Sequence, residues 1–388
     1  MERIKTVYTD STAVRSLVHE RSHGGATAAR NIHFTDSSCL NTRITDMTPP
    51  NGEGLEPPEI VILDGGFSTQ LSCHVGHVID GDPLWSARFL YTNPDEVVNT
   101  HLDFLRAGAD VIITNTYQAS VSGFVEHLGV TPEKADELIR QAVEMAKRAR
   151  SLYLEEYDTY VQNVRTPLVV GSVGPYGAHL HDGSEYDGSY ADTVSVEVMR
   201  EWHRPRFQAL VEAGVDLLAL ETIPCQEEAE MLCDLLREFP NTKAWLSFCC
   251  KDDQSIAHGE SFQKVAKKCW EANSDQLVAV GVNCCAPSFV TNLLKGINDD
   301  RPHAPIPLIV YPNSGEKYNP QIGWIDRDKC EPVEMFIQEW LDLGVRYVGG
   351  CCRTYAPDVS RIRNQVHCWR DRCRFQAKYK QTAKENIN

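Results

Sequence analysis

Short apolar runs alternate with longer amphipathic segments along the chain from Ile60 onward. The short runs are rich in Val, Ile and Leu, which is typical of strands buried on both faces of a parallel sheet. The alternation with amphipathic segments predicts repeated strand–helix units. Eight such runs follow one another, over residues 60–63, 111–114, 168–173, 217–220, 244–248, 277–282, 308–311 and 347–350.

The amphipathic segments carry signals of helix ends. Five of them begin with proline at or near the first turn, where its missing N–H costs nothing. Gly108, Gly214 and Gly344 lie just before a predicted strand, where glycine commonly ends a helix. Eight strand–helix units predict a (β/α)8 TIM barrel over residues 58–371. The expected helices cover residues 94–107, 132–152, 194–213, 226–239, 261–272, 287–297, 332–343 and 357–369.

The two ends of the chain differ from this pattern. Residues 1–57 are rich in Ser, Thr, Arg, His and Asn and show no apolar periodicity, so we expect a disordered N-terminal extension. Their Arg and Ser content is also found in organelle transit peptides, although Glu2, Asp10 and Glu20 weaken that interpretation. Residues 372–388 are expected to form a charged C-terminal tail.

The charge balance is acidic, with 38 Lys and Arg against 54 Asp and Glu and a formal net charge of −16. This balance argues against nucleic acid or an anionic membrane as a partner and favours small polar substrates. No apolar run approaches the ~20 residues needed to cross a bilayer, and no secretory signal pattern is present. We therefore expect a soluble, cytoplasmic protein. In that setting its 14 cysteines are expected to be reduced thiols or metal ligands.

Cysteine pairs follow three of the predicted strands, the fifth, the sixth and the eighth. In a TIM barrel the active site lies at the carboxyl ends of the strands, and the sixth and eighth strands end in Cys284-Cys285 and Cys351-Cys352. Because the sixth and eighth strands are only two apart on the rim, cysteine side chains that follow them can converge on one ion. Three cysteine ligands with an open fourth position are the arrangement of a catalytic zinc. The alternative is that these are small buried apolar residues.

Position alone leaves open which cysteines would bind. Cys249, Cys250 and Cys285 compete with the others, because all follow predicted strands. Of the adjacent Cys284 and Cys285, one should face the barrel axis and the other the helix layer.

Three motifs resemble those of the homocysteine S-methyltransferases: LDGGFSTQL from Leu63, GVNCC from Gly281 and GGCCRT from Gly349. The resemblance covers residues 60–363, nearly the whole predicted barrel. It implies that Cys284, Cys351 and Cys352 hold Zn²⁺, and it sets the other cysteines aside. The stretches GSVGPYGAHLHDGSEYDGSY from Gly171 and YPNSGEKY from Tyr311 resemble the branch that uses S-methylmethionine.

The resemblance also implies a site for the amino-acid end of homocysteine. Glu221, in LETIP, matches an acid that contacts the amino group, and Asp64 matches the acid of the DGG motif. Gly65, Gly66 and Thr116 match positions that surround the amino-acid end. Each has a structural alternative, since glycines form tight turns and carboxylates often cap helices.

The implied reaction is methyl transfer from S-methylmethionine or S-adenosylmethionine to homocysteine, giving methionine. A free thiol has a pKa of about 8.5, and coordination to zinc deprotonates it. A cationic donor favours aromatic faces, and among the rim aromatics Tyr176 is the predicted donor contact. The other candidates are Phe67, Tyr117, Tyr186, Tyr190 and Trp324.

Two other functions fit parts of the same pattern. Betaine as donor would use the same zinc and homocysteine residues and a different donor pocket. A non-catalytic zinc- or thiol-binding protein would need the cysteines alone, and the acids after the first and fourth strands argue against it, because they suit an amino-acid zwitterion.

Overall fold

The computed structural model describes residues 57–76, 79–158, 165–319 and 323–385. The N-terminal extension expected over residues 1–57 lies outside these ranges, apart from Pro57. None of the helices among the described residues is both long enough and apolar enough to span a bilayer.

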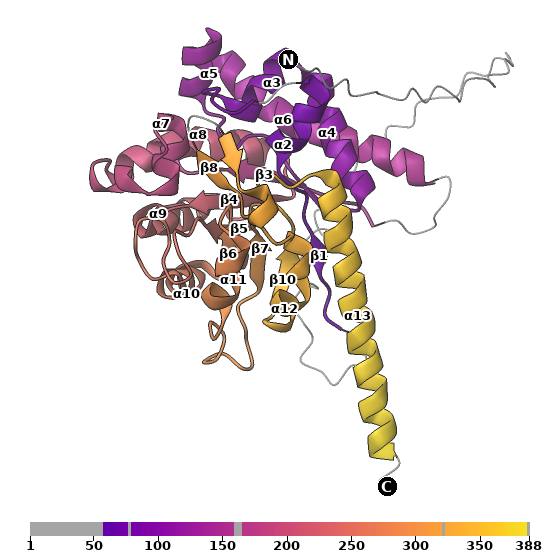
Figure 1. The fold of residues 1–388 in the computed structure, drawn as a ribbon. Coiled ribbons are helices and arrows are strands. Elements are labelled where there is room, and N and C mark those ends of the chain that lie inside the picture. Colours follow the sequence, from indigo (N-terminus) through magenta and orange to yellow (C-terminus); the bar gives the residue numbers. More distant parts are fainter. Residues whose placement is uncertain (1–56, 77–78, 159–164, 320–322, 386–388) are drawn as a thin grey trace, which may run out of the picture.

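Eight parallel strands form one sheet in the order β1-β10-β7-β6-β5-β4-β3-β2 (Figure 1). Helices connect them in sequence, which confirms the predicted (β/α)8 barrel. All eight strands lie within three residues of the predicted runs. They are β1 (Val61–Ile62), β2 (Val111–Ile113), β3 (Leu168–Val173), β4 (Leu217–Ile223), β5 (Ala244–Phe248), β6 (Leu277–Asn283), β7 (Leu308–Tyr311) and β10 (Val345–Val348).

The helices of the outer layer also follow the prediction. The largest difference is at the C-terminus, where α13 continues through most of the expected charged tail and extends beyond the barrel (Figure 1). The outer helices are α4 (Pro94–Ala107), α6 (Pro132–Asp158), α8 (Val196–Glu212), α9 (Gln226–Leu236), α10 (Phe262–Asn273), α11 (Pro287–Leu294), α12 (Ile337–Asp342) and α13 (Ala356–Glu385).

Several short elements in the loops at the carboxyl ends of the strands were not predicted. The hairpin of β8 and β9 follows β7, and most of the short helices follow β1, β2 and β3. They are too short for a periodic pattern to stand out. Those that bear on the site are α2 (Phe67–Val75), α5 (Val121–Leu128), α7 (Tyr176–Leu180), η2 (Ser184–Tyr186), η3 (Ser189–Asp192), β8 (Lys317–Asn319) and β9 (Gly323–Ile325).

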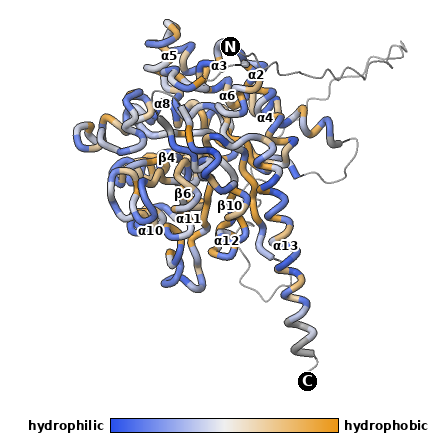
Figure 2. The backbone as a smooth tube through the Cα atoms, in the orientation of Figure 1, coloured by the Kyte–Doolittle hydropathy of each residue, from blue (hydrophilic) through white to orange (hydrophobic). Residues whose placement is uncertain are grey.

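The core has two layers, which explains why the strands are apolar on both faces. Val61 and Leu63 point into the barrel, whereas Ile60 and Ile62 pack against the helices. Trp245 and Tyr311 fill much of the barrel interior. Figure 2 shows the apolar segments gathered along the strands and hydrophilic ones on the outside. The interior is packed, so only the rim is left for chemistry.

Aspartate side chains bridge β1 and β2, which stand at the two ends of the strand order. The Ile62 amide donates to Oδ2 of Asp110 at 2.9 Å, and the Ile113 amide donates to Oδ2 of Asp64 at 2.7 Å. The Asp110 amide in turn donates to the Ile62 carbonyl at 2.7 Å. These bonds close the barrel where a regular strand ladder is missing from the described pairings.

We expect Asp110→Ala to lower the free energy of unfolding by about 1–3 kcal/mol, because the buried Ile62 amide would lose its acceptor. Urea unfolding followed by circular dichroism measures the change. Asp110→Asn keeps an oxygen acceptor and should lose less. Equal stabilities for Asp110→Ala and the unsubstituted protein would show that the bridge does not matter.

Candidate active site

Two cysteine turns are held together by β7 and the loop after it, residues 311–314, which we term the β7 loop. Beside β6, the Cys284 amide donates to the Tyr311 carbonyl at 3.2 Å, and the Asn313 amide donates to the Cys285 carbonyl at 3.1 Å. Beside β10, the Cys351 amide donates to the Pro312 carbonyl at 2.8 Å, and the Ser314 amide donates to the Cys352 carbonyl at 3.1 Å. Four backbone bonds therefore fix the turns relative to one another.

These turns bring three sulfur atoms together. The Sγ atoms of Cys284, Cys351 and Cys352 all lie within 4.8 Å of one another, and those of Cys284 and Cys352 are 3.6 Å apart. Tetrahedral zinc with Zn–S bonds of about 2.3 Å requires sulfurs about 3.8 Å apart, so the spacing suits that ion. Cys284 has φ +50°, a left-handed conformation that is uncommon for a residue with a side chain. The convergence of the thiols therefore requires a strained backbone conformation at Cys284.

The three thiols share one negative charge. Hydrogen bonds from Cys351 and Cys352 lower the pKa of Cys284 to about 6. The pKa values of Cys351 and Cys352 are raised well above the usual range, chiefly by these hydrogen bonds with Cys284. A divalent cation would replace the shared protons and hold all three as thiolates.

The other candidate cysteines have a different environment. Cys250 and Cys285 belong to the hydrophobic layer between the sheet and the helices, so Cys285 faces away from Cys284. Burial raises the pKa of Cys285 to about 12 and also raises that of Cys249. These neutral, buried thiols behave as small apolar residues. The cysteines of the described part of the chain are all free thiols.

The two glycines after β1 allow the cysteine turn after β10 to approach closely. A Cβ on Gly66 would lie 2.5 Å from the Cys351 carbonyl oxygen, and one on Gly65 would lie 2.8 Å from that of Thr354. The Gly66 amide donates to the Thr354 carbonyl at 2.9 Å. The DGG turn is therefore packed directly against the backbone that carries two of the three sulfurs.

An inner cavity of about 70 Å³ lies between these turns and the ends of β2, β3 and β4. We define it by its lining, which includes most of the residues predicted to bind the substrate. Asp64, Gly65, Gly66 and Glu221 all contribute to it. The remaining lining residues are Phe67, Trp85, Ser86, Ile113, Thr114, Asn115, Tyr117, Ser172, Tyr186, Thr222, Cys284, Tyr311, Gly350, Cys351 and Cys352.

The two acids of the inner cavity have different partners. Glu221 is only 7% exposed, and the Ser172 hydroxyl donates to its Oε1. Burial raises the pKa of Glu221 to about 7. Asp64 is 1% exposed, and burial likewise raises its pKa well above the usual range. One oxygen of each acid is therefore already engaged, by the Ile113 amide at Asp64 and by the Ser172 hydroxyl at Glu221.

Two predicted residues do not line the inner cavity. The Thr116 hydroxyl is fully buried and donates to the Ser172 carbonyl at 2.7 Å, so it ties the end of β2 to β3. Tyr176 opens α7, and its ring packs edge-on against Trp202, with centroids 5.2 Å apart. The structure therefore places the Tyr176 ring against α8, among aromatic neighbours.

A larger outer cavity of about 600 Å³ adjoins the inner one. Trp85, Tyr117, Tyr186, Cys284 and Cys352 line both, so the sulfur cluster lies at their junction. Neither Trp85 nor Glu185 in this wall was singled out from the sequence; Trp85 lies in no quoted motif, and Glu185 lies in the stretch from Gly171 without a role assigned to it. The outer cavity is further lined by Ser68, Thr69, Ser72, Ile79, Asp80, Gly81, Asp82, Pro83, Gln118, His181, Gly183, Glu185, Asn313, Glu316, Trp324 and Arg353.

A buried charge network holds the loop between β3 and α8, residues 174–195, which we term the β3 loop. Glu228 on α9 accepts from the Tyr176 amide at 2.7 Å, from the Tyr190 hydroxyl and from Nε2 of His203 at 2.7 Å. Burial lowers the pKa of His203 to about 4, so its neutral ring accepts at Nδ1 from Arg206 at 2.8 Å. The neutral His203 ring thus links the Glu228 carboxylate to the Arg206 guanidinium.

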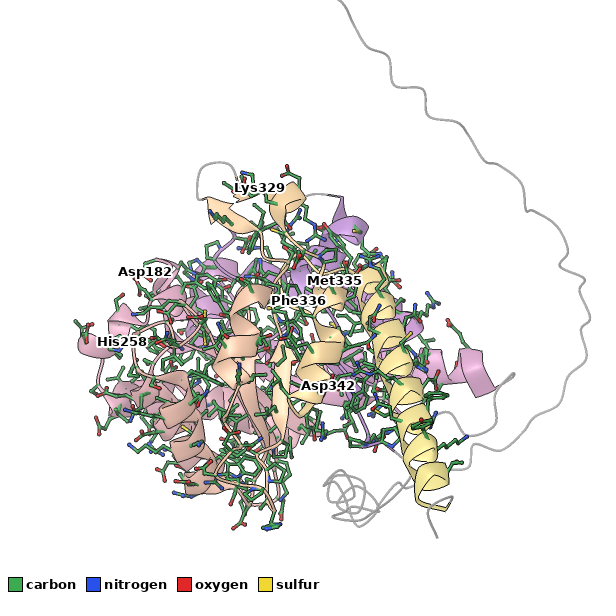
Figure 3. The ribbon with its side chains drawn as sticks, turned by 60° about the horizontal axis from the view of Figure 1, so that its bottom comes forward. Asp182, His258, Lys329, Met335, Phe336 and Asp342 are labelled. Atoms are coloured by element: carbon green, nitrogen blue, oxygen red, sulfur yellow. The ribbon has the colours of Figure 1, made fainter. Side chains whose placement is uncertain are left out.

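The outer side of the β3 loop rests on the loop after β5. A Cβ on Gly188 would lie 2.8 Å from that of His258, and Nε2 of His258 is 3.4 Å from Asp192. In Figure 3, Asp182 and His258 lie on the same side of the molecule. The β3 loop is thus held on its buried side by Glu228 and on its outer side by His258.

The fold and the site together describe a (β/α)8 barrel that carries a cluster of three cysteines at the carboxyl ends of its strands. The family model described as homocysteine S-methyltransferase matches residues 61–366. The chain belongs to that family.

Curated relatives agree with this family. The chain is 49% identical over 314 residues to betaine-homocysteine S-methyltransferase of Drosophila melanogaster, covering 79% of this chain and 94% of that protein. It is 39% identical over 306 residues to homocysteine S-methyltransferase 1 of Arabidopsis thaliana, covering 78% and 91%.

A solved structure supports the same assignment. The metallated form of the homocysteine methyltransferase MmuM from Escherichia coli superposes with a TM-score of 0.68 at 37% identity, covering 79% of this chain and 96% of that chain. Its oxidized form gives a TM-score of 0.70, also at 37% identity, covering 83% and 99%.

We expect Cys284→Ala, Cys351→Ala and Cys352→Ala each to lose bound zinc, because two sulfurs cannot replace three. Metal analysis after dialysis measures zinc per chain. Cys285→Ala is the matched control and should retain the metal, since this thiol lies in the hydrophobic layer. Full zinc occupancy in any of the first three variants would remove that cysteine from the ligand set.

Proposed function

We propose that the protein transfers a methyl group from a sulfonium donor, S-methylmethionine or S-adenosylmethionine, to the thiol of homocysteine, giving methionine. We further propose that Cys284, Cys351 and Cys352 hold a Zn²⁺ ion. The main support is the position of the sulfur cluster, because Cys284 and Cys352 line both the inner and the outer cavity. A thiol bound there would lie between two separate substrate spaces.

The donor set fits a catalytic zinc site, with three thiolates and room for a fourth sulfur. Zinc, when bound, would deprotonate the homocysteine thiol, whose ordinary pKa is about 8.5. The new bond forms between that sulfur and the methyl carbon. The bond from the methyl carbon to the donor sulfur breaks, and its electron pair leaves with a neutral thioether. No general acid is required, so the main task of the protein is positioning.

The amino-acid end of homocysteine would occupy the inner cavity. Glu221 offers a carboxylate for the substrate ammonium, held in place by the Ser172 hydroxyl. Gly65 and Gly66 leave backbone open to the substrate, and Asp64 holds the β1 end against β2. Thr116 would support the site indirectly: its hydroxyl donates to the carbonyl of Ser172, the residue whose own hydroxyl bonds Glu221.

The outer cavity suits a cationic donor. Trp85, Tyr117 and Tyr186 present aromatic faces, and Tyr186 is 47% exposed over the site. Aromatic faces and carboxylates both attract sulfonium and ammonium cations. Tyr176 would support this wall through its packing under the β3 loop.

Betaine is the second candidate donor. It is favoured by the name of the Drosophila melanogaster relative, at 49% identity. Betaine is also a methylated cation, and it would require the same zinc and the same inner cavity. A non-catalytic thiol-binding role is less well supported, since it leaves the buried Glu221 without a purpose.

The decisive experiment is a methyl-transfer assay with homocysteine and three donors: S-methylmethionine, S-adenosylmethionine and betaine. We expect methionine from at least one sulfonium donor, loss of turnover after chelation, and recovery when zinc is restored. Turnover with betaine alone would replace the donor assignment. Tight homocysteine binding without turnover of any donor would contradict the enzymatic proposal.

The pH dependence of homocysteine use should report Glu221. Its carboxylate is needed to bind the ammonium, and its pKa of about 7 means that protonation removes it as the pH falls. We expect kcat/KM for homocysteine to decrease about tenfold per pH unit below pH 7. Zinc content measured at each pH separates this effect from metal loss.

Glu221→Gln is the matched variant for that profile. It should lower kcat/KM at pH 8 by about 10- to 100-fold, the value of a hydrogen bond to a charged group, and remove the acid limb assigned to this carboxyl. An unchanged acid limb in this variant would assign the titration to another group.

A further inference from the structure

The outer cavity contains more negative than positive side chains. Its described lining has four carboxylates, Asp80, Asp82, Glu185 and Glu316, and one guanidinium, Arg353. A site of this composition favours ligands with positive charge. Internal bonds already occupy most of these acids, so their partners decide which one remains for a ligand.

Three of the four acids have partners inside the protein. Asp82 pairs with Arg88. Glu316 pairs with Arg353 at 3.2 Å and accepts from the Ser314 hydroxyl at 2.7 Å. Asp80 accepts a 3.4 Å hydrogen bond from the Trp85 indole. The cation Arg353 is therefore already engaged as well.

Glu185 differs from the other three. Its Oε2 is buried and has no hydrogen-bond partner among the described residues, and the same is true of the Tyr117 hydroxyl. Both groups line the outer cavity, and the charge of Glu185 raises the pKa of Tyr117, second only to the effect of burial. A buried carboxylate oxygen without a partner is costly, so this one calls for an explanation, and a ligand in the outer cavity would supply one.

The rest of the structure holds both groups in place. Glu185 lies in η2 of the β3 loop, which is tied to Glu228 through Tyr190. The Tyr117 carbonyl accepts from Nη1 of Arg206 at 3.0 Å, and its ring packs edge-on against Trp85. The backbone that carries both side chains is therefore held in place.

The chemistry of the missing partner follows from the groups that lack one. A carboxylate oxygen and a hydroxyl oxygen that line one cavity suit a cation that also donates hydrogen bonds. A primary ammonium carries three N–H donors. The trimethylammonium group of betaine and a sulfonium centre carry none, so neither can satisfy these acceptors.

We propose that Glu185 and Tyr117 bind the α-ammonium group of an amino-acid methyl donor and so select amino-acid sulfonium donors over betaine. This inference rests on the proposed methyl transfer and names the residues that set donor specificity. Tyr117 also lines the inner cavity, so a donor held there by its ammonium lies beside the sulfur cluster.

The test compares two donors in steady-state kinetics with homocysteine. S-methylmethionine has an α-ammonium group, and dimethylsulfonioacetate is a sulfonium without one. We expect Glu185→Gln to lower kcat/KM for S-methylmethionine by about 10- to 100-fold and to change that for dimethylsulfonioacetate less than about threefold. Equal losses with both donors, or no loss with S-methylmethionine, would overturn the assignment.

Two further variants separate binding from general effects. Tyr117→Phe removes only the unpaired hydroxyl and should weaken use of S-methylmethionine selectively, by about 3- to 10-fold. Asp187→Asn removes one negative charge from an exposed position of the same loop and keeps an oxygen acceptor for the Ser189 amide. It should leave both donors unchanged, and a loss equal to that of Glu185→Gln would assign the effect to overall charge.

Stability gives an independent readout. Removing a buried carboxylate without a partner should leave the melting temperature of the free protein unchanged or raise it, whereas loss of a structural residue would lower it. A lower melting temperature in Glu185→Gln would contradict the inference. The unsubstituted protein tests the proposed function separately, because its failure to use any sulfonium donor would be seen before a variant is made.

Discussion

The chemistry of this protein depends on four backbone hydrogen bonds from residues 311–314 to the two cysteine turns. Cys284 and Cys352 are 68 residues apart in the chain, and only this shared support brings their sulfurs within 3.6 Å. The absence of side chains at Gly65 and Gly66 lets a third loop close over the turn that follows β10. The sulfur cluster on the barrel rim is thus positioned mainly by main-chain contacts.

The two cavities divide the work of recognition. The inner one is small, buried and acidic, and it suits the amino-acid end of a thiol substrate. The outer one is larger and lined by aromatic and acidic residues. In-line methyl transfer needs its acceptor and donor on opposite sides of the methyl carbon, and two adjoining cavities with the sulfur cluster at their junction are compatible with that requirement.

Polar groups are treated differently in the scaffold and in the site. Behind the β3 loop, Glu228 accepts from the His203 ring, which in turn accepts from Arg206. In the outer cavity, oxygens of Glu185 and Tyr117 have no hydrogen-bond partner among the described residues. The hydrogen-bonded network holds the loop that carries Glu185, and the proposed ligand would supply the missing partner.

The barrel could be predicted from the sequence because its strands and long helices have regular apolar spacing and local end signals, which depend on neighbouring residues only. The same reasoning placed cysteines after the sixth and eighth strands. It could not choose between Cys284 and Cys285, because a left-handed turn at Cys284 and bonds from residues 311–314 decide which sulfur enters the site. It also favoured Tyr176 and missed Glu185, since the β3 loop has no periodic pattern and takes its shape from contacts with α8, α9 and His258. Local spacing determined the elements, and only long-range packing decided which side chains face the cavities.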